Sequence, residues 1–255
     1  MLRYESVGPR AVVTIDDPER HYPLSNDAMA GLADAVSWAA ADEGVRVVVI
    51  TGAGDKAFSA GGDLSGGFVD TPIGQHGPRG ALADLFRNLR RCPKPTIARV
   101  NGHALGGGFG LAAACDIVIA AEGALLGTPE IRVGLWPMMI SAVLKPLVPQ
   151  KALFEMMATG RRISAEEAMR LGVVSRVVPA ADLDRAVDET VDALLRYSPA
   201  TLALGKSAFY AIEDMDLDTA LDHLHIGLTA TGTTEDAAEG IAAFIGKRDP
   251  DWKGR

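Results

Sequence analysis

Residues 101–111 read Asn-Gly-His-Ala-Leu-Gly-Gly-Gly-Phe-Gly-Leu, and this stretch carries the strongest structural signal in the chain. Its three consecutive glycines, residues 106–108, stand ahead of an apolar run that predicts a short helix over residues 106–114. Glycine lets the backbone come very close to a ligand, and the first N–H groups of a helix point outward without a partner. Such donors can hold a developing oxyanion. Close packing of a helix against a strand would also demand glycine, and this stretch alone does not separate the two explanations.

The segments on either side of this stretch alternate between strand-like and helix-like patterns. Residues 45–51 form a β-branched run typical of a strand buried on both faces. Asn26 is predicted to cap an Ala-rich helix that runs to about residue 41. Further strands are predicted at residues 11–15, 95–100 and 116–120, and a further helix at residues 80–91. The alternation predicts an α/β core.

From Pro137 onward the pattern becomes mainly helical. Ser164 and Glu167 have the spacing of a capping box. We expect a boundary near residues 196–199, after which an amphipathic helical tail packs on the core or on a neighbouring subunit. Helices are predicted over residues 138–148, 151–158, 164–171, 182–196, 199–213, 217–231 and 234–245, with one last strand within residues 173–178.

The composition places the chain among soluble globular proteins, with 48% hydrophobic and 23% charged residues in a length of 255. The net charge of −8 works against nucleic acid as a partner, because its backbone usually meets a basic face. No targeting segment or membrane helix is visible, so we expect a cytoplasmic protein with no membrane partner. Cys92 and Cys115 form neither a disulfide framework nor a Cys/His cluster, so we expect both to be buried and no metal to be bound.

A second glycine-rich stretch, residues 52–64, reads Gly-Ala-Gly-Asp-Lys-Ala-Phe-Ser-Ala-Gly-Gly-Asp-Leu. Gly52, Gly54 and Ala57 satisfy the GxGxxA fingerprint of dinucleotide binding directly after a predicted strand, which would indicate an NAD-dependent enzyme. That fingerprint needs a helix to begin inside the motif, whereas residues 59–62, Ser-Ala-Gly-Gly, would interrupt one. A strand ending in a flexible loop over residues 52–67 is the other structural explanation.

Taken together with three further motifs, the two glycine-rich stretches resemble the successive signatures of the enoyl-CoA hydratase/isomerase (crotonase) superfamily. The motifs follow the family's usual order and spacing and cover most of the chain. They are residues 58–64, residues 101–111 with Ala114-Cys115-Asp116 behind them, Pro129-Glu130 with Gly134, residues 159–174, and Glu239-Gly240 through Lys247-Arg248 in the tail. The resemblance implies a ClpP/crotonase α/β core of repeated β-β-α units over residues 1–196. It also implies a C-terminal helical trimerisation region over residues 197–255, and a homotrimer that is often paired into a hexamer.

The resemblance further implies an acyl-CoA thioester substrate and no cofactor beyond the coenzyme A that the substrate carries. By motif position, the thioester oxygen would lie between the backbone N–H groups of Gly62 and Gly107. Prepositioned donors stabilise the enolate charge that builds on this oxygen when a proton moves beside it. Glu130 is the expected acid/base, because a lone carboxylate beside the apolar residues 131–136 should have a raised pKa.

The rest of the substrate is assigned by the same resemblance. The adenine edge is expected against the backbone around Ala60 and Leu64, and Asp63 is expected to contact the coenzyme A portion. The phosphates are expected near Arg20 or His21, although His21 departs from the basic residue usual there, and near Lys247 or Arg248, which another subunit could supply. Trp136 and Met138 would reshape the acyl pocket under a variable loop over residues 68–76, although Met138 and Met139 could equally fill the core.

Gly110 is the main departure from the family's best-known pattern. Hydratases of that kind carry a second glutamate at this position, and the two carboxylates together hold and activate water. Three possibilities follow: a double-bond isomerase that needs only Glu130, a hydratase that holds water in another way, or a protein that binds acyl-CoA without turnover. Asp70 and His76 are candidate substitutes for the missing acid, His103 is expected to be structural, and Met138 replaces the aspartate of the dienoyl-CoA isomerase branch.

Overall fold

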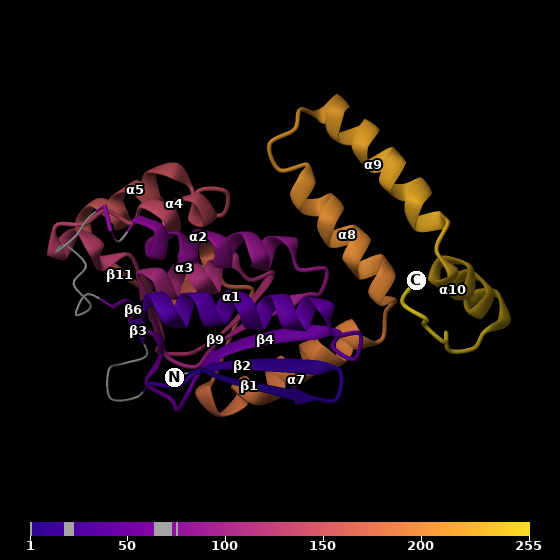
Figure 1. The fold of residues 1–255 in the computed structure, drawn as a ribbon, viewed down its shortest axis with the longest axis horizontal. Helices are drawn as coiled ribbons and strands as arrows, with labels where there is room; N and C mark the ends of the chain where they lie inside the picture. Colours follow the sequence, from indigo (N-terminus) through magenta and orange to yellow (C-terminus); the bar gives the residue numbers. More distant parts are fainter. Residues whose placement is uncertain (1, 18–22, 64–72, 75) are drawn as a thin grey trace.

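The computed structural model describes residues 2–17, 23–63, 73–74 and 76–255 (Figure 1). Among these residues the main sheet has six strands in the order β1-β2-β4-β7-β9-β12, antiparallel between β1 and β2 and parallel elsewhere. All residues of β4 are buried, which explains its continuous apolar sequence. The strands are β1 (Leu2–Val7), β2 (Arg10–Ile15), β4 (Val47–Gly52), β7 (Thr96–Val100), β9 (Ile117–Ala121) and β12 (Arg176–Val178).

A second sheet carries the short strands that position the site. Within the described residues its order is β11-β10-β8-β5, and β3 pairs separately with β6. β7 and β9 are each followed by one strand of this second sheet and then by helical structure, and β4 is followed by β5, by β6 and then by a helix, so the repeated β-β-α units are confirmed. The bounds are β3 (Pro23–Leu24), β5 (Ala57–Ser59), β6 (Gly61–Gly62), β8 (His103–Leu105), β10 (Leu125–Gly127) and β11 (Arg162–Ser164).

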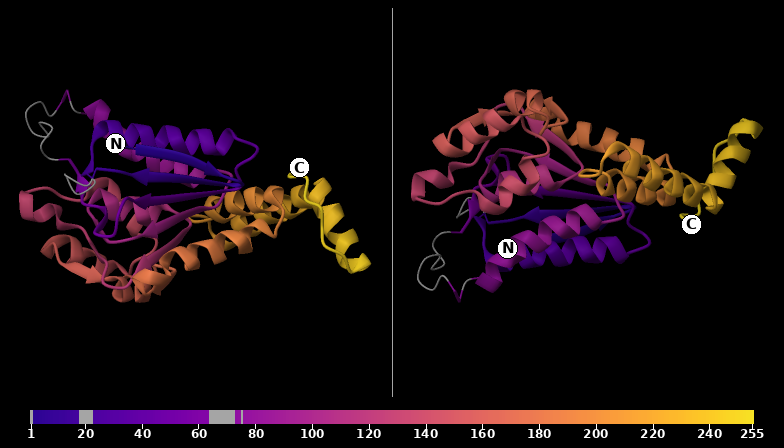
Figure 2. Two further views of the ribbon diagram at one scale, coloured as in Figure 1. Left: turned by 90° about the horizontal axis from the view of Figure 1, so that it is seen from below. Right: turned by 90° about the horizontal axis from the view of Figure 1, so that it is seen from above.

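Helices cover both faces of the main sheet (Figure 2). Because successive side chains of a strand point to opposite faces, Val48 and Ile50 join the core under α1 (Asn26–Ala41) and α2 (His76–Arg91). Val47 and Val49 instead pack with Leu183 and Val187 of α7 (Leu183–Leu195). The remaining core helices are α3 (Gly107–Ala114), η2 (Pro129–Val133), α4 (Met138–Leu144), α5 (Gln150–Thr159), α6 (Ala165–Arg170) and η3 (Ala180–Asp182).

Two local predictions are wrong. Asn26 is the first residue of α1 and not its cap, because the Oγ of Ser25 accepts the hydrogen bond from the N–H of Ala28 at 3.1 Å. The stretch after Gly52 is not wholly a loop, since it forms β5 and β6 before residue 63. These strands have two or three residues each, which is too short for alternation of apolar residues to reveal them.

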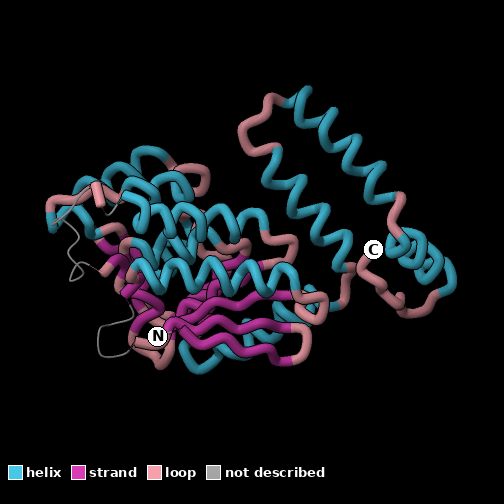
Figure 3. Tube along the Cα trace, viewed as in Figure 1, coloured by secondary structure: helices cyan, strands magenta, loops and turns pink. Residues whose placement is uncertain are grey.

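The last three helices stand apart from the two sheets (Figures 1 and 3). They are α8 (Pro199–Ala211), α9 (Leu217–Gly232) and α10 (Glu235–Gly246), and we call residues 197–255 the helical arm. α8 and α9 contribute no residue to the hydrophobic core. The break between α7 and α8 falls at residues 196–198, and the arm's role as a trimerisation region stays a prediction. No helix within the described residues is long and apolar enough to cross a membrane.

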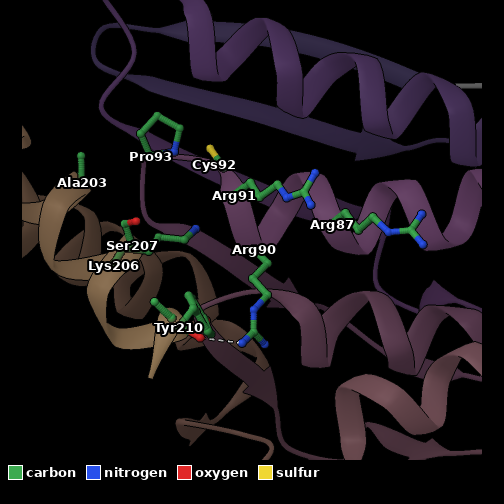
Figure 4. A pocket seen from close by; sticks show the side chains of 10 residues that line it. Arg87, Arg90, Arg91, Cys92, Pro93, Ala203, Lys206, Ser207 and Tyr210 are labelled. Atoms are coloured by element: carbon green, nitrogen blue, oxygen red, sulfur yellow. Dashed lines mark hydrogen bonds between the residues drawn. The ribbon is translucent and has the colours of Figure 1, made fainter. Parts of the chain in front are cut away.

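A mostly buried polar cluster ties the arm to the core. The Nζ of Lys206 on α8 donates to the backbone oxygens of Leu89 and Lys94 and, at 2.7 Å, to Asp116 Oδ2. Tyr210 of the same helix donates to Asp116 Oδ1 at 2.7 Å. The exposed fractions of the Lys206 and Asp116 side chains are only 8% and 16%. Lys206 and Tyr210 also line a cavity of about 480 Å³ between α2 and α8 (Figure 4).

We predict that Lys206→Met lowers the free energy of unfolding by about 3–5 kcal/mol, because it leaves Asp116 charged and unpaired in a mostly buried place. Chemical denaturation would measure this, and proteolysis near residues 196–199 should become faster. Arg185→Met is the matched control, since it removes an exposed pair with Asp182 and Glu189 and should leave the stability nearly unchanged. Equal effects of the two substitutions would contradict the prediction.

Candidate active site

The start of α3 presents a backbone N–H group that has no acceptor within its own helix. β8 ends at Leu105, Gly106 adopts a φ of +52°, and α3 begins at Gly107. The N–H of Gly106 donates a hydrogen bond to Gly127 O at 2.8 Å, and this bond holds the turn against β10. Gly107 is the first residue of the helix, so its N–H is one of the donors that no earlier carbonyl of the helix can satisfy.

Gly62 on β6 supplies a second backbone donor close by. The N–H of Asp63 donates to Leu24 O of β3 at 3.2 Å, and successive N–H groups of a strand point to opposite sides, so the N–H of Gly62 points away from β3. A Cβ atom built on Gly107 would lie 3.7 Å from the nitrogen of Gly62. The two predicted oxyanion donors are therefore neighbours, although they are far apart in the sequence.

Two more glycines of these stretches are required by close packing. A Cβ atom on Gly108 would lie 2.6 Å from both Cβ and O of Ser59, which shows how tightly α3 packs on β5. Gly61 has a φ of +97°, and a Cβ atom there would lie 2.7 Å from Leu105 O. Both explanations of the glycine triplet are thus found in the structure: Gly108 permits packing, and Gly107 presents a donor.

Glu130 lies beside these donors. It follows Pro129 at the start of η2, and its Oε1 is 2.9 Å from the position of a Cβ atom built on Gly106. Its Oε2 is buried and has no hydrogen-bond partner among the described residues. Burial raises the pKa of this carboxyl above its ordinary value, as expected from the apolar residues that follow it. A half-buried carboxylate with an unused oxygen is suited to accepting and returning a proton near neutral pH.

Ala60 and Asp63 lie on the same segment as Gly62, and their contact with coenzyme A stays a prediction. Arg20, His21, Leu64 and Asp70, together with most of the loop over residues 68–76, lie outside the described residues. Lys247 does not join this site within one chain, because it ends α10 in the arm, which is at the opposite end of the molecule from β3 and β6 (Figure 1).

Arg248 is held inside the arm by both carboxylate oxygens of Glu239, at 2.6 and 2.9 Å. Trp136 is half-buried, and its ring contacts that of Phe154 at 5.9 Å between centroids. Met138 has an exposed fraction of 72%, so the suggestion that it fills the core is wrong, whereas Met139 packs against the core.

His76 is exposed at the start of α2. His103 joins β8 to β10 by accepting a hydrogen bond from the N–H of Leu125 on Nδ1 at 3.1 Å, which fits the predicted structural role.

The dinucleotide explanation of residues 52–57 lacks its structural context. A helix would have to begin inside the motif, but β5 begins at Ala57. A Cβ atom on Gly52 would lie only 2.3 Å from Ala57 O, so this glycine allows the chain to double back tightly. The described residues also contain no group of three or more His, Cys, Asp or Glu side chains that could hold a metal ion.

Paired backbone donors beside a lone carboxylate are typical of enzymes that move a proton next to a carbonyl group. The profile of the enoyl-CoA hydratase/isomerase family matches residues 5–255. A Thermus thermophilus protein that carries the name of an enoyl-CoA hydratase is 38% identical over 248 residues, which are 95% of this chain and 97% of that protein. The chain therefore belongs to the enoyl-CoA hydratase/isomerase (crotonase) family of acyl-CoA enzymes.

Two further comparisons agree with this membership. The carnitinyl-CoA dehydratase of Salmonella typhimurium is 37% identical over 256 residues, covering 97% of this chain and 96% of the relative. The crystal structure of an enoyl-CoA hydratase from Mycobacterium smegmatis has a TM-score of 0.94 at 32% identity, covering 98% of both chains. The named activities of these relatives are those of lyases that act on CoA thioesters.

We predict that Glu130→Gln raises the melting temperature at neutral pH. A carboxyl whose pKa is higher in the folded than in the unfolded state weakens folding as the pH rises above its unfolded pKa of 4.5, and the full loss is reached above the folded pKa. The gain from glutamine should thus shrink towards zero as the pH falls below 4.5. Thermal unfolding of the wild type and the variant, from neutral pH to below 4.5, measures this difference in melting temperature.

Glu239→Gln is the contrasting control. Hydrogen bonds from Arg248 lower the pKa of Glu239 to about 2, so this variant should lose stability at neutral pH. A melting temperature of Glu130→Gln that is below wild type at neutral pH would contradict the burial argument.

Proposed function

We propose that this chain binds an enoyl-CoA thioester and transfers a proton at the carbon next to its carbonyl, isomerising or hydrating the double bond. The observation that carries the proposal is the meeting of three groups: the N–H groups of Gly62 and Gly107 and the carboxylate of Glu130. The thioester oxygen would accept from the two N–H groups. The C2 carbon would then face Glu130, and coenzyme A would be part of the substrate, with no other cofactor needed.

In the proposed mechanism the two glycines contribute electrostatics and Glu130 contributes proton transfer. Loss or gain of a proton at C2 passes through an enolate, whose negative charge rests on the thioester oxygen. One preorganised donor of this kind is typically worth about 10²–10³ in rate, and a positioned acid/base about 10²–10⁴. Because both donors are backbone groups of glycine, only the fold around β6 and α3 holds them in place.

The binding of the coenzyme A portion is proposed from the motif positions. Ala60, Asp63 and Leu64 would contact the adenine edge with backbone groups, and Arg20 or His21 would meet the phosphates. Lys247 would bind phosphate at the site of a second subunit, because the site of its own chain lies at the opposite end of the molecule from α10. Arg248 is a weaker candidate for phosphate contact, because Glu239 already pairs with it.

We predict that Glu130→Gln lowers kcat for isomerisation of 3-enoyl-CoA and for hydration of 2-enoyl-CoA by about 10²–10⁴ while CoA binding changes little. In the wild type, kcat/KM should fall on acidification with a midpoint above the ordinary glutamate pKa of 4.5, because the ionised carboxylate is the base. Enoyl absorbance and calorimetric titration with CoA give the two readouts. Glu122→Gln, an exposed glutamate on a turn, is the matched control and should keep full activity.

Full activity in Glu130→Gln would overturn this mechanism. Binding of short, long and branched acyl-CoAs without turnover by the wild type would replace it with the alternative of a non-catalytic acyl-CoA binding protein. Binding of NAD(H) would support the dinucleotide alternative.

We also propose that the helical arm assembles the chain into a homotrimer, which could pair into a hexamer. Large apolar side chains are exposed along it: Phe209 on α8, Leu217 and Ile226 on α9, and Phe244 on α10, with exposed fractions of 69–85%. Monomers rarely leave so many apolar side chains exposed together, and such a surface is typical of a protein interface.

We predict that Leu217→Asp/Ile226→Asp reduces the mass measured by light scattering from that of a trimer or hexamer to that of a monomer, because burying two carboxylates in an apolar interface is costly. Ile73→Asp, at an exposed isoleucine outside the arm, is the control and should keep the wild-type mass. A monomeric wild type would refute the assembly proposal.

A further inference from the structure

The wall of the site next to Glu130 is formed by Gly106 and by a glycine face of α3, and neither carries side chains. Gly106 and Gly110 are one helical turn apart, and the N–H of Gly110 donates to Gly106 O at 3.1 Å. Gly107 and Gly110 are three residues apart within α3 and therefore lie on the same face of that helix. A Cβ atom on Gly106, which precedes α3 with a φ of +52°, would lie 2.9 Å from Glu130 Oε1, and Gly110 extends the glycine face of α3 one turn further from Gly106.

The space in front of Gly110 is already filled. A Cβ atom there would lie 2.9 Å from Cζ of Phe86, and 3.1 and 3.2 Å from Cγ1 and Cγ2 of Ile140. Phe86 comes from α2 and Ile140 from α4, and their exposed fractions are 8% and 4%. We call these two side chains the apolar plug. Even a methyl group at residue 110 would require one of them to shift, and a longer acidic side chain would require much more.

The plug determines which proton transfers the site can serve. For a 3-enoyl-CoA, Glu130 takes the proton from C2, and the C2–H electron pair enters the enolate. The enolate electrons then form the C2=C3 bond, and the former C3=C4 pair takes the same proton back at C4. No water or second acid is needed. Hydration adds a water oxygen at C3 and a proton at C2, so water must also be held and deprotonated, and an apolar wall gives it no partner.

We propose that Phe86 and Ile140 are specificity-determining residues that fill the place of a second acid and its water, so that the enzyme isomerises 3-enoyl-CoA faster than it hydrates 2-enoyl-CoA. This inference rests on the proposed function of Glu130 and of the two backbone donors. Two apolar side chains that lie far from residue 110 in the sequence would thus decide which reaction the site favours.

The test compares three proteins: wild type, Phe86→Ala/Ile140→Ala, and the same pair with Gly110→Glu. The probes are matched 3-enoyl and 2-enoyl thioesters, hexenoyl-CoA and decenoyl-CoA, with products separated by chromatography. The triple variant should raise the ratio of hydration to isomerisation by about tenfold or more over wild type, because a positioned acid/base contributes about 10²–10⁴. Leu89→Ala/Leu144→Ala truncates two fully buried residues one turn along the same helices and should keep the wild-type ratio.

Stability gives a second readout if the doubly truncated protein folds poorly. Phe86→Leu and Ile140→Val remove less volume. Gly110→Ala should lower the melting temperature less when it is added to either of these variants than when it is made in the wild type. If the changes in melting temperature simply added, the proposed contact of residue 110 with the plug would be refuted, because substitutions at contacting residues are expected to be coupled.

A wild type that hydrates faster than it isomerises, or an unchanged ratio in a folded triple variant, would overturn the inference even though Glu130→Gln is inactive. Activity that survives in Glu130→Gln would instead refute the proposed function itself.

Discussion

The whole structure depends on the close approach of two backbone segments, the turn from β8 into α3 and the end of β5 running into β6. A backbone N–H group that is left without a partner in a folded protein costs free energy, so a fold keeps one only where the surroundings leave no alternative. Here the positive φ angles of Gly61 and Gly106 and the contact of Gly108 with Ser59 fix that arrangement. The second sheet is what supplies these contacts, since its strands β5, β8 and β10 end beside the site.

Long and strongly patterned elements could be predicted from the sequence. The buried run in β4, the capped helix α6 and the helices of the arm all carry apolar periodicity or cap residues that act locally. The positions of Gly62, Gly107 and Glu130 could be proposed as well, because each lies in a motif whose glycines or proline constrain the backbone. What periodicity could not reveal were strands of two or three residues, whose stability comes from their neighbours and not from their own sequence.

The surroundings of residue 110 could not be predicted for a different reason. The sequence shows that a glycine stands there, but it does not show what fills the space in front of it. Phe86 and Ile140 are ordinary core residues in their own helices, and only the packing of α2, α3 and α4 brings them together. A missing side chain can thus be read from the sequence, whereas the atoms that replace it are a property of the tertiary structure. The same holds for Lys206, whose partners come from three separate segments.

The contacts of Lys206 also bear on how the chain is made. Its three acceptors belong to α2, to the segment before β7 and to the residue before β9, and all of them leave the ribosome before α8 does. Domains generally fold as units during synthesis, beginning at the N-terminal side. The Lys206 ammonium can find its place only on a main sheet whose central strands have already paired. Docking of α8 through Lys206 therefore requires a core in which α2, β7 and β9 already have their native positions.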